Sequence, residues 1–218
     1  MGDREHEESG IQYHEVVHGA PDDAELPMIV SFHGRGGTPH VPDGSFYGVS
    51  RPVRLIVPRG PARVGEGYAW YDAGLASGAD RIAAELTAAT ARIAAFVERV
   101  RARHPTAGAP IATGFSQGGM LTLALALRHP ELLRAAFPVA AWIPDALVPD
   151  ELARHQVLIR MMHGAADEVV PSEPTVRLVD RLRGAGWDIE LRTYESVAHD
   201  TSAVMTAQLH QWLEESLG

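Results

Sequence analysis

The stretch Gly114–Gly118 has the sequence GFSQG and joins a short apolar run at 109–113 to an Ala/Leu-rich run at 120–127. A β-capable segment that passes through Gly-x-Ser-x-Gly directly into a helical segment is the pattern of a nucleophile elbow. The flanking glycines leave room for backbone around Ser116 and permit a strained turn. The following helix would point its positive N-terminal end toward an oxyanion formed beside the serine. A plain glycine-rich turn with a capping serine is the alternative for the motif alone.

The composition is that of an ordinary globular protein. The 218 residues suit one domain, and 45% of them are hydrophobic and 22% charged. No apolar run approaches the ~20 residues that a bilayer-spanning helix needs. The acidic N-terminus lacks the apolar core of a secretory signal peptide. We therefore expect a cytoplasmic protein without a transmembrane segment.

Charge and missing residue types exclude several kinds of partner and chemistry. The net charge of −9 argues against binding to a phosphate backbone, so we expect no nucleic-acid partner. A chain without cysteine has no disulfide, thiol nucleophile or thiolate metal site. The 11 histidines show no His-Glu-x-x-His or comparable spacing, and no dinucleotide fingerprint is present. The sequence thus predicts neither a metal nor a cofactor.

Strand-like and helix-like segments alternate along the chain, which predicts a mainly parallel sheet of about seven strands with helices on both faces. No repeat or linker interrupts residues 11–218, so we expect a single α/β domain there. Residues 1–10 are charged and are predicted to be a disordered tail. The predicted strands cover 11–17, 28–32, 53–57, 109–113, 132–139, 156–162 and 187–194, and the predicted helices outside the elbow cover 80–103, 172–182 and 201–217.

Three residues suited to nucleophilic catalysis follow the ends of predicted strands, in the order Ser116, Asp167 and His199. Nucleophile, acid and base occur in this order in α/β-hydrolases. A serine hydroxyl needs a base to accept its proton, which His199 can do while Asp167 fixes the imidazole tautomer. Taken singly, His199 could be a surface histidine and Asp167 a turn or cap residue. Their joint placement favours catalysis.

The glycine-rich loop His33–Gly37 follows another strand of the buried type and would expose backbone N–H groups to an anion or an oxyanion. A plain flexible turn is the alternative. The loop lacks the Gly-x-x-x-x-Gly-Lys-Ser/Thr spacing of a nucleotide-binding loop, so phosphate binding is disfavoured. His33 and His163 are interpreted as structural or surface residues. The aromatic residues at 68–71 lie on a predicted loop and favour core packing over a substrate wall.

Several short motifs are spread over nearly the whole chain: HGRG at 33–36, residues 58–72 ending in WYD, GFSQGG at 114–119, WIP at 142–144, HGAADEVVP at 163–171, and His199 before the last helix. Together they resemble the carboxylesterase/phospholipase family of α/β-hydrolases, which includes the acyl-protein thioesterases. The resemblance implies the α/β-hydrolase fold with Ser116, Asp167 and His199 as catalytic triad. It also implies that the backbone N–H groups of Arg35 and Gln117 form the oxyanion hole.

The resemblance further implies a substrate groove bordered by the loops that carry Trp70 and Trp142. We add Met120 and Val169 as candidate substrate contacts. Members of the family act on carboxylic esters, and some act on thioesters or lysophospholipids.

Three functions stay open at this point. The leading hypothesis is a metal-free serine hydrolase that cleaves carboxylic esters through an acyl-enzyme, and the second is an acyl thioesterase or lysophospholipase on the same fold. The third is a catalytically silent ligand-binding module. We expect a small-molecule ester or acyl substrate and a monomer or homodimer. Two departures from the family pattern bear on the substrate: Arg35 replaces a residue that is usually apolar, and residues 37–38 replace an acidic continuation.

Overall fold

The computed structural model describes residues 3–39, 48–149 and 157–217. Within these ranges the strands are β1 (Asp3–Glu8), β2 (Ile11–His18), β3 (Met28–Phe32), β4 (Val53–Pro58), β5 (Ala62–Val64), β6 (Gly67–Ala69), β7 (Ile111–Phe115), β8 (Ala135–Val139), β9 (Leu158–Gly164) and β10 (Ile189–Tyr194). The α-helices are α1 (Ala79–Arg103), α2 (Gln117–Arg128), α3 (Ser172–Gly184) and α4 (Ala203–Ser216). Short 3₁₀ helices lie at Leu75–Ser77, Pro130–Leu132 and Asp145–Leu147.

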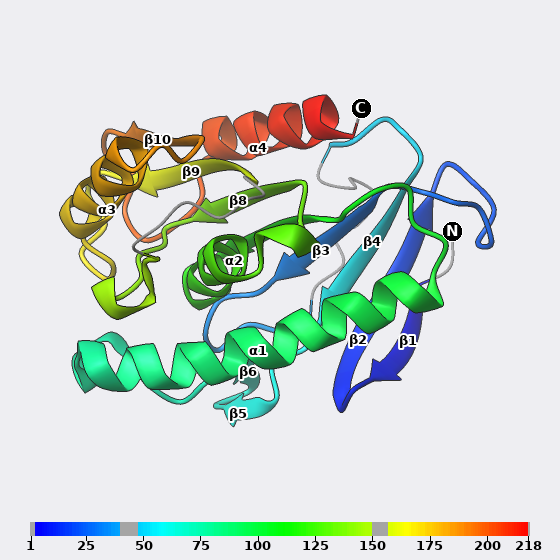
Figure 1. Ribbon diagram of the computed structural model, residues 1–218, viewed down its shortest axis with the longest axis horizontal. Coiled ribbons are helices and arrows are strands. Elements are labelled where there is room, and N and C mark those ends of the chain that lie inside the picture. The colour runs from blue at the N-terminus through cyan, green and yellow to red at the C-terminus, as the bar shows by residue number, and fades with distance from the viewer. Residues whose placement is uncertain (1–2, 40–47, 150–156, 218) are drawn as a thin grey trace.

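One large sheet runs through the molecule, with the strand order β1-β2-β4-β3-β7-β8-β9-β10 (Figure 1). β2 is antiparallel to both of its neighbours, β1 and β4. All the other neighbouring pairs in this sheet are parallel. The prediction of a mainly parallel sheet is confirmed, and the sheet has eight strands rather than about seven.

Helices cover both faces of this sheet. α1, α2 and α3 pack on one face and α4 packs on the other (Figure 1). Successive side chains of a strand point to opposite faces, so Leu55 of β4 joins the core beneath α4 while Ile56 joins the core beneath α1 and α2. Coverage of both faces explains why the central strands are buried at nearly every position. Among the described helices, none is long and apolar enough to cross a membrane.

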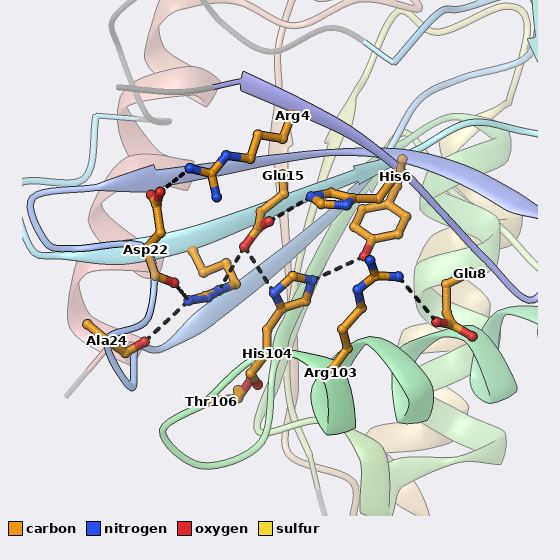
Figure 2. Close-up of polar contacts among 11 residues, drawn as sticks. Arg4, His6, Glu8, Glu15, Asp22, Ala24, Arg103, His104 and Thr106 are labelled. Atoms are coloured by element: carbon orange, nitrogen blue, oxygen red, sulfur yellow. Dashed lines mark hydrogen bonds and ion pairs between the residues drawn. The ribbon is translucent and has the colours of Figure 1, made fainter.

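The N-terminal residues correct the prediction of a disordered tail. Residues 3–8 form β1, which pairs with β2 in antiparallel register, while residues 1–2 lie outside the described residues. A polar side chain of β1 has a partner inside the protein, because His6 Nε2 lies 2.9 Å from Glu15 Oε2 (Figure 2). Composition alone had favoured solvation of these charges. Their partners come from other segments, which local sequence does not reveal.

The aromatic segment after β4 also differs from the prediction, since we expected a loop and the structure has the hairpin of β5 and β6. Tyr68 of β6 is paired with the glycine-rich loop after β3. The Gly36 N–H donates to Tyr68 O at 2.7 Å, and the Tyr68 N–H donates to Gly37 O at 2.8 Å. The hairpin therefore holds the glycine-rich loop in place at the carboxyl end of β3.

Candidate active site

The carboxyl ends of three parallel strands, β7, β9 and β10, bring the predicted catalytic side chains together. Ser116 follows β7, Asp167 follows β9 and His199 follows β10, and the ends of parallel strands meet at one edge of a sheet. His199 contacts both of the others. Its Nε2 lies 2.9 Å from Ser116 Oγ, and its Nδ1 lies 2.7 Å from Asp167 Oδ2. We call this hydrogen-bonded chain the Ser-His-Asp relay.

Ser116 occupies a strained turn between β7 and α2. Its φ is +55°, in the left-handed region that non-glycine residues rarely adopt. The flanking glycines are required by close backbone contacts. A Cβ on Gly114 would lie 2.5 Å from Gly118 O, and a Cβ on Gly118 would lie 2.2 Å from Phe32 O. The crowding predicted from Gly-x-Ser-x-Gly is therefore present, and β3 supplies part of it.

The carboxylate of Asp167 is buried and held by its own turn. Its Oδ1 accepts hydrogen bonds from the Val169 N–H at 2.9 Å and the Val170 N–H at 2.8 Å. These two bonds orient the carboxylate so that Oδ2 faces His199. A carboxylate held in this orientation can stabilise an imidazolium on His199.

His163, which the sequence indicated as structural or surface, is fully buried beside this turn. Its Nε2 lies 2.7 Å from Val170 O, and since a carbonyl can only accept, Nε2 carries the hydrogen. Burial lowers the pKa of His163, so the ring is neutral near pH 7. It therefore acts as a structural donor that fixes the turn beneath Asp167.

His33 plays a similar part under the glycine-rich loop. Its Nδ1 donates to Gly34 O at 2.7 Å, and its Nε2 accepts from the Gly60 N–H at 3.0 Å. Burial lowers the pKa of His33, which agrees with this neutral tautomer. The bonds fix the loop from which the Arg35 N–H is expected to act. Among the described residues, none accepts a hydrogen bond from the backbone N–H of Arg35 or of Gln117.

A pocket of about 410 Å³ opens beside Ser116 and His199. The candidate substrate contacts Met120 and Val169 line it, whereas no sequence pattern indicated much of the remaining wall. Ile82, for example, belongs to α1, whose periodicity indicated only a core-facing helix. The described residues that line the pocket are Arg35, Tyr71, Ala73, Gly74, Leu75, Ile82, Ser116, Gln117, Met120, Val169, Val170 and His199.

The loop that carries Trp70 borders the pocket, as predicted, through residues 71 and 73–75, but the side chains of Trp70 and Trp142 are not among the described lining residues. Trp70 is buried; its ring packs edge-on against Phe32, and its Nε1 donates to His33 O at 2.8 Å. Trp142 is partly buried and packs against the main hydrophobic core. Trp70 thus follows the core-packing alternative for the aromatic residues at 68–71, since burial of a large aromatic surface is strongly favourable.

Two side chains of the site fix the loop that follows β6. Gln117 accepts from the Trp70 N–H through Oε1 and donates to Tyr71 O through Nε2, both at 2.9 Å. Arg35 Nη1 donates to Tyr71 O at 3.1 Å and to Asp72 O at 2.9 Å. One wall of the pocket is therefore attached to both the elbow and the glycine-rich loop. The sequence left open whether the Arg35 side chain meets solvent or substrate, and it did not indicate these side-chain contacts to the loop.

A second pocket, of about 450 Å³, lies at the opposite edge of the sheet, beside α4 and the starts of β8 and β9. Two of its three arginines are paired with carboxylates: Arg160 contacts Asp188 at 2.8 Å, and Arg192 contacts Glu190 at 2.8 Å. No residue of the Ser-His-Asp relay lines it. The part of the chain that the structure describes also holds no group of three or more His, Asp or Glu side chains placed to bind a metal ion. The relay pocket is the better candidate for chemistry.

Known proteins resemble this chain in sequence. Residues 12–217 match the family model described as phospholipase/carboxylesterase. A probable carboxylesterase of Oryza sativa subsp. japonica is 32% identical over 107 residues, which are 48% of this chain and 40% of the relative. Acyl-protein thioesterase 1 of Gibberella zeae is 27% identical over 110 residues, which are 48% of this chain and 46% of the relative. The chain thus aligns with less than half the length of these curated relatives.

Solved structures share its architecture. Esterase PE8 matches with a TM-score of 0.79 and 24% identity, over 92% of this chain and 97% of that chain. Acyl-protein thioesterase 2 of Zea mays matches with a TM-score of 0.71 and 21% identity, over 94% of this chain and 99% of that chain. Identities this low show the fold alone. They confirm the predicted α/β-hydrolase fold.

Proposed function

The chain belongs to the phospholipase/carboxylesterase family, and from that premise we propose that it is a serine hydrolase that cleaves carboxylic esters through an acyl-enzyme. The observation that carries the proposal is the unbroken Ser-His-Asp relay, whose serine lines a pocket of about 410 Å³. A serine without such a base is a poor nucleophile at neutral pH.

In the proposed first step, Ser116 Oγ attacks the ester carbonyl carbon while its proton moves to His199 Nε2. A carbon–oxygen bond to the serine forms and the carbonyl π electrons move to oxygen, which gives a tetrahedral oxyanion. We assign the backbone N–H groups of Arg35 and Gln117 as the hydrogen-bond donors to this oxyanion. Neither donates a hydrogen bond to another described residue. When the carbonyl re-forms, the bond to the alcohol oxygen breaks and His199 returns the proton to that oxygen.

Deacylation repeats these steps with water as the nucleophile. His199 takes a proton from water, hydroxide adds to the acyl carbon, and collapse of the second oxyanion releases the acid and restores the Ser116 hydroxyl. Asp167 stabilises the imidazolium in both halves without itself taking the proton. Its two backbone hydrogen bonds suit that role, because they hold Oδ1 while Oδ2 faces His199.

A thioesterase acting through the same residues is the second candidate. The similarity to acyl-protein thioesterase 1 of Gibberella zeae favours it. The chemistry of attack is the same for the two bonds, so the relay does not separate them. Matched oxygen and sulfur esters of one acid would do so through their relative kcat/KM.

The proposal is tested by covalent labelling with a serine-directed fluorophosphonate. We expect the wild type to be labelled at Ser116 and to lose its turnover of 4-nitrophenyl esters in proportion. Ser116→Ala should take up no label, whereas Ser9→Ala, which removes an exposed serine far along the chain, should be labelled as the wild type is. Undiminished ester turnover by a folded Ser116→Ala protein would overturn the proposal. A series of acyl-chain lengths then defines the preferred acid.

A further inference from the structure

Arg35 gives the candidate pocket an unusual electrostatic character. Among the described residues that line it, Arg35 is the only Lys, Arg, Asp or Glu. Most of the other walls are apolar, with Leu75, Ile82, Met120 and Val169 among them. A guanidinium is always charged near neutral pH, so the pocket combines an apolar interior with one fixed positive charge.

The guanidinium is held in place by uncharged partners. One nitrogen, Nη1, makes both contacts to the loop, at 3.1 Å to Tyr71 O and 2.9 Å to Asp72 O. No described carboxylate forms an ion pair with Arg35, and no described residue accepts from its Nε or Nη2. These two atoms form one edge of the planar group, whose parallel N–H bonds match the two oxygens of a carboxylate. The Arg35 side chain is therefore exposed, it is held in position by two carbonyls, and no described carboxylate neutralises its charge.

Among the described residues, the ionisable ones around Arg35 form no ion pair with it: Tyr71 and Asp72 contact it only through their backbone carbonyls, and Glu85 has other partners. Burial raises the pKa of Tyr71 well above its ordinary value, so its phenol is neutral, and its hydroxyl contacts Met120 Sδ at 3.4 Å. Glu85 of α1 is turned to Arg81, at 2.8 Å, and to the Ala73 N–H, at 2.7 Å. The protein as a whole repels anions, with its net charge of −9. A local cation at the pocket is thus what an anionic substrate would need.

We propose that this pocket selects esters that carry a carboxylate on their acyl or alcohol part, with Nε and Nη2 of Arg35 as the anchoring donors. The inference rests on the proposed function, since it names the substrate class of the same site. Apolar walls would hold the methylene chain of such a substrate while the guanidinium pairs with its charged end. The Arg35 side chain acts here apart from its backbone N–H, which belongs to the proposed oxyanion hole.

The test compares isosteric substrates in variants of one residue. Mono-(4-nitrophenyl) adipate and 4-nitrophenyl hexanoate differ only by a terminal carboxylate in place of a methyl group. A second pair, 4-carboxyphenyl hexanoate and 4-methylphenyl hexanoate, places the charge on the alcohol part instead. The readout is the ratio of kcat/KM for the anionic substrate to that for the neutral substrate. Comparing this ratio between wild type and variant cancels both leaving-group differences and any general loss at the oxyanion hole.

We expect Arg35→Gln to lower this ratio about tenfold for one of the two pairs, as removal of a charge-assisted hydrogen bond does. Arg35→Lys should lie between Arg35→Gln and the wild type, because it keeps the charge but loses the planar edge. Arg134→Gln, which makes the same change in net charge at the start of β8, should leave the ratio unchanged. The pair that responds identifies the charged part of the substrate.

Equal ratios in wild type and Arg35→Gln on both pairs would overturn the inference, and would leave Arg35 as a brace for the loop at 71–72. Arg35→Lys is included in case Arg35→Gln is destabilised. If the ratio of anionic to neutral kcat/KM is unchanged in both variants, Arg35 does not anchor the substrate carboxylate, whatever the stability of the variants. Failure of the proposed function has a different signature. In that case Ser116→Ala would retain turnover on all four esters, whereas failure of the inference alone leaves Ser116→Ala inactive.

Discussion

A second linked set of a hydroxyl, an imidazole and a carboxylate lies beneath the N-terminal strands, formed by Tyr13, His104 and Glu15. Tyr13 Oη is 3.1 Å from His104 Nε2, and His104 Nδ1 is 3.1 Å from Glu15 Oε1 (Figure 2). We call it the Tyr-His-Glu relay. It has the same order of atoms as the Ser-His-Asp relay, in which the corresponding distances are 2.9 and 2.7 Å. The two regions differ in what surrounds those atoms.

The hydroxyls differ most. Ser116 is half-buried beside the pocket that His199 also lines, whereas Tyr13 is only 1% exposed and packs against Phe96 of α1. Burial raises the pKa of Tyr13, which makes its phenolate harder to form. A buried hydroxyl that cannot meet a substrate has only a structural role, here as the donor to His104.

The carboxylates differ in their partners. Asp167 is held by backbone N–H groups, while Glu15 is held by side chains: His6 at 2.9 Å and the fully buried Arg54, whose Nε lies at 3.3 Å. Arg54 in turn donates from Nη2 to Asp22 O at 2.7 Å. Glu15 therefore joins β1, β2, β4 and the end of α1 into one unit. The comparison teaches that a hydroxyl-imidazole-carboxylate order does not by itself make a nucleophile.

Removing the hydroxyl of Ser116 or of Tyr13 should show the largest difference in activity between the two relays. We expect Ser116→Ala to lower kcat on a neutral ester about 10⁴-fold, because the acyl-enzyme depends on that oxygen. Tyr13→Phe should leave kcat unchanged. Initial rates at 25 °C, with thermal unfolding as a check on folding, measure both. Retention of more than about a tenth of wild-type turnover by Ser116→Ala would remove Ser116 from the nucleophile role.

The two carboxylates give the next largest contrast in activity. Asp167→Asn should lower kcat roughly 10³- to 10⁴-fold, since an amide presents the wrong partner to His199 and favours the wrong tautomer. Glu15→Gln should leave kcat unchanged below its unfolding temperature. Single-turnover rates with a 4-nitrophenyl ester report the effect on acylation. Nearly normal rates in Asp167→Asn would move the role of the acid to another residue.

The contrast reverses for stability, where Glu15 should matter more than Asp167. We expect Glu15→Gln to lower the free energy of unfolding by about 3–5 kcal/mol, because the buried Arg54 loses its counter-ion. Glu7→Gln, on the exposed side of β1, is the matched control and should change it by less than about 0.5 kcal/mol. Urea unfolding measures both variants. A Glu15→Gln protein as stable as the control would show that Arg54 does not depend on this partner.

Tyr13→Phe tests the weaker end of the same network. The change keeps the ring against Phe96 but leaves His104 Nε2 without its donor, which should cost about 1–3 kcal/mol of unfolding free energy. Equilibrium urea unfolding is the measurement, with an unchanged m-value as the control for two-state behaviour. A stability gain would mean that the hydroxyl is not the donor to His104.

Acid should weaken the Tyr-His-Glu relay through His104. Burial is the main cause that lowers the pKa of His104; Glu15 opposes it, and Arg54, His6 and Arg103 add to it. A lowered folded-state pKa means that protonation favours the unfolded chain. The stabilisation is therefore present above the ordinary imidazole pKa of about 6.5 and is lost as pH falls below it, by at most about 1.4 kcal/mol per pH unit for this group.

The measurement is the free energy of unfolding between pH 7.5 and pH 4.5 for wild type and His104→Gln. We expect the variant to lose less stability across this range, although His33, His163 and His210, whose pKa values are also lowered by burial, still contribute. Parallel curves for the two proteins would exclude His104 from the titration.

Much of the fold and the centre of the candidate site followed from sequence because their signals are local. Gly-x-Ser-x-Gly with its apolar flanks predicted the elbow, and the structure shows the crowding that requires glycine at 114 and 118. The periodicity at 80–103 predicted α1 within one residue. The order of Ser116, Asp167 and His199 at strand ends predicted their meeting at one edge, because parallel strands place those ends together.

Other features were decided only by tertiary structure, because they join residues that no local pattern relates. Tyr13 meets His104 across 91 positions, and residues 3–8 pair with β2, so that a charged N-terminal stretch becomes part of the sheet. Arg35 meets the carbonyls of residues 71 and 72, so a side chain that sequence alone left between solvent and substrate becomes a fixed cation at the pocket. Hydrophobic period and turn chemistry act over a few residues, whereas partners for buried charges and pocket walls are chosen by the packing of whole elements.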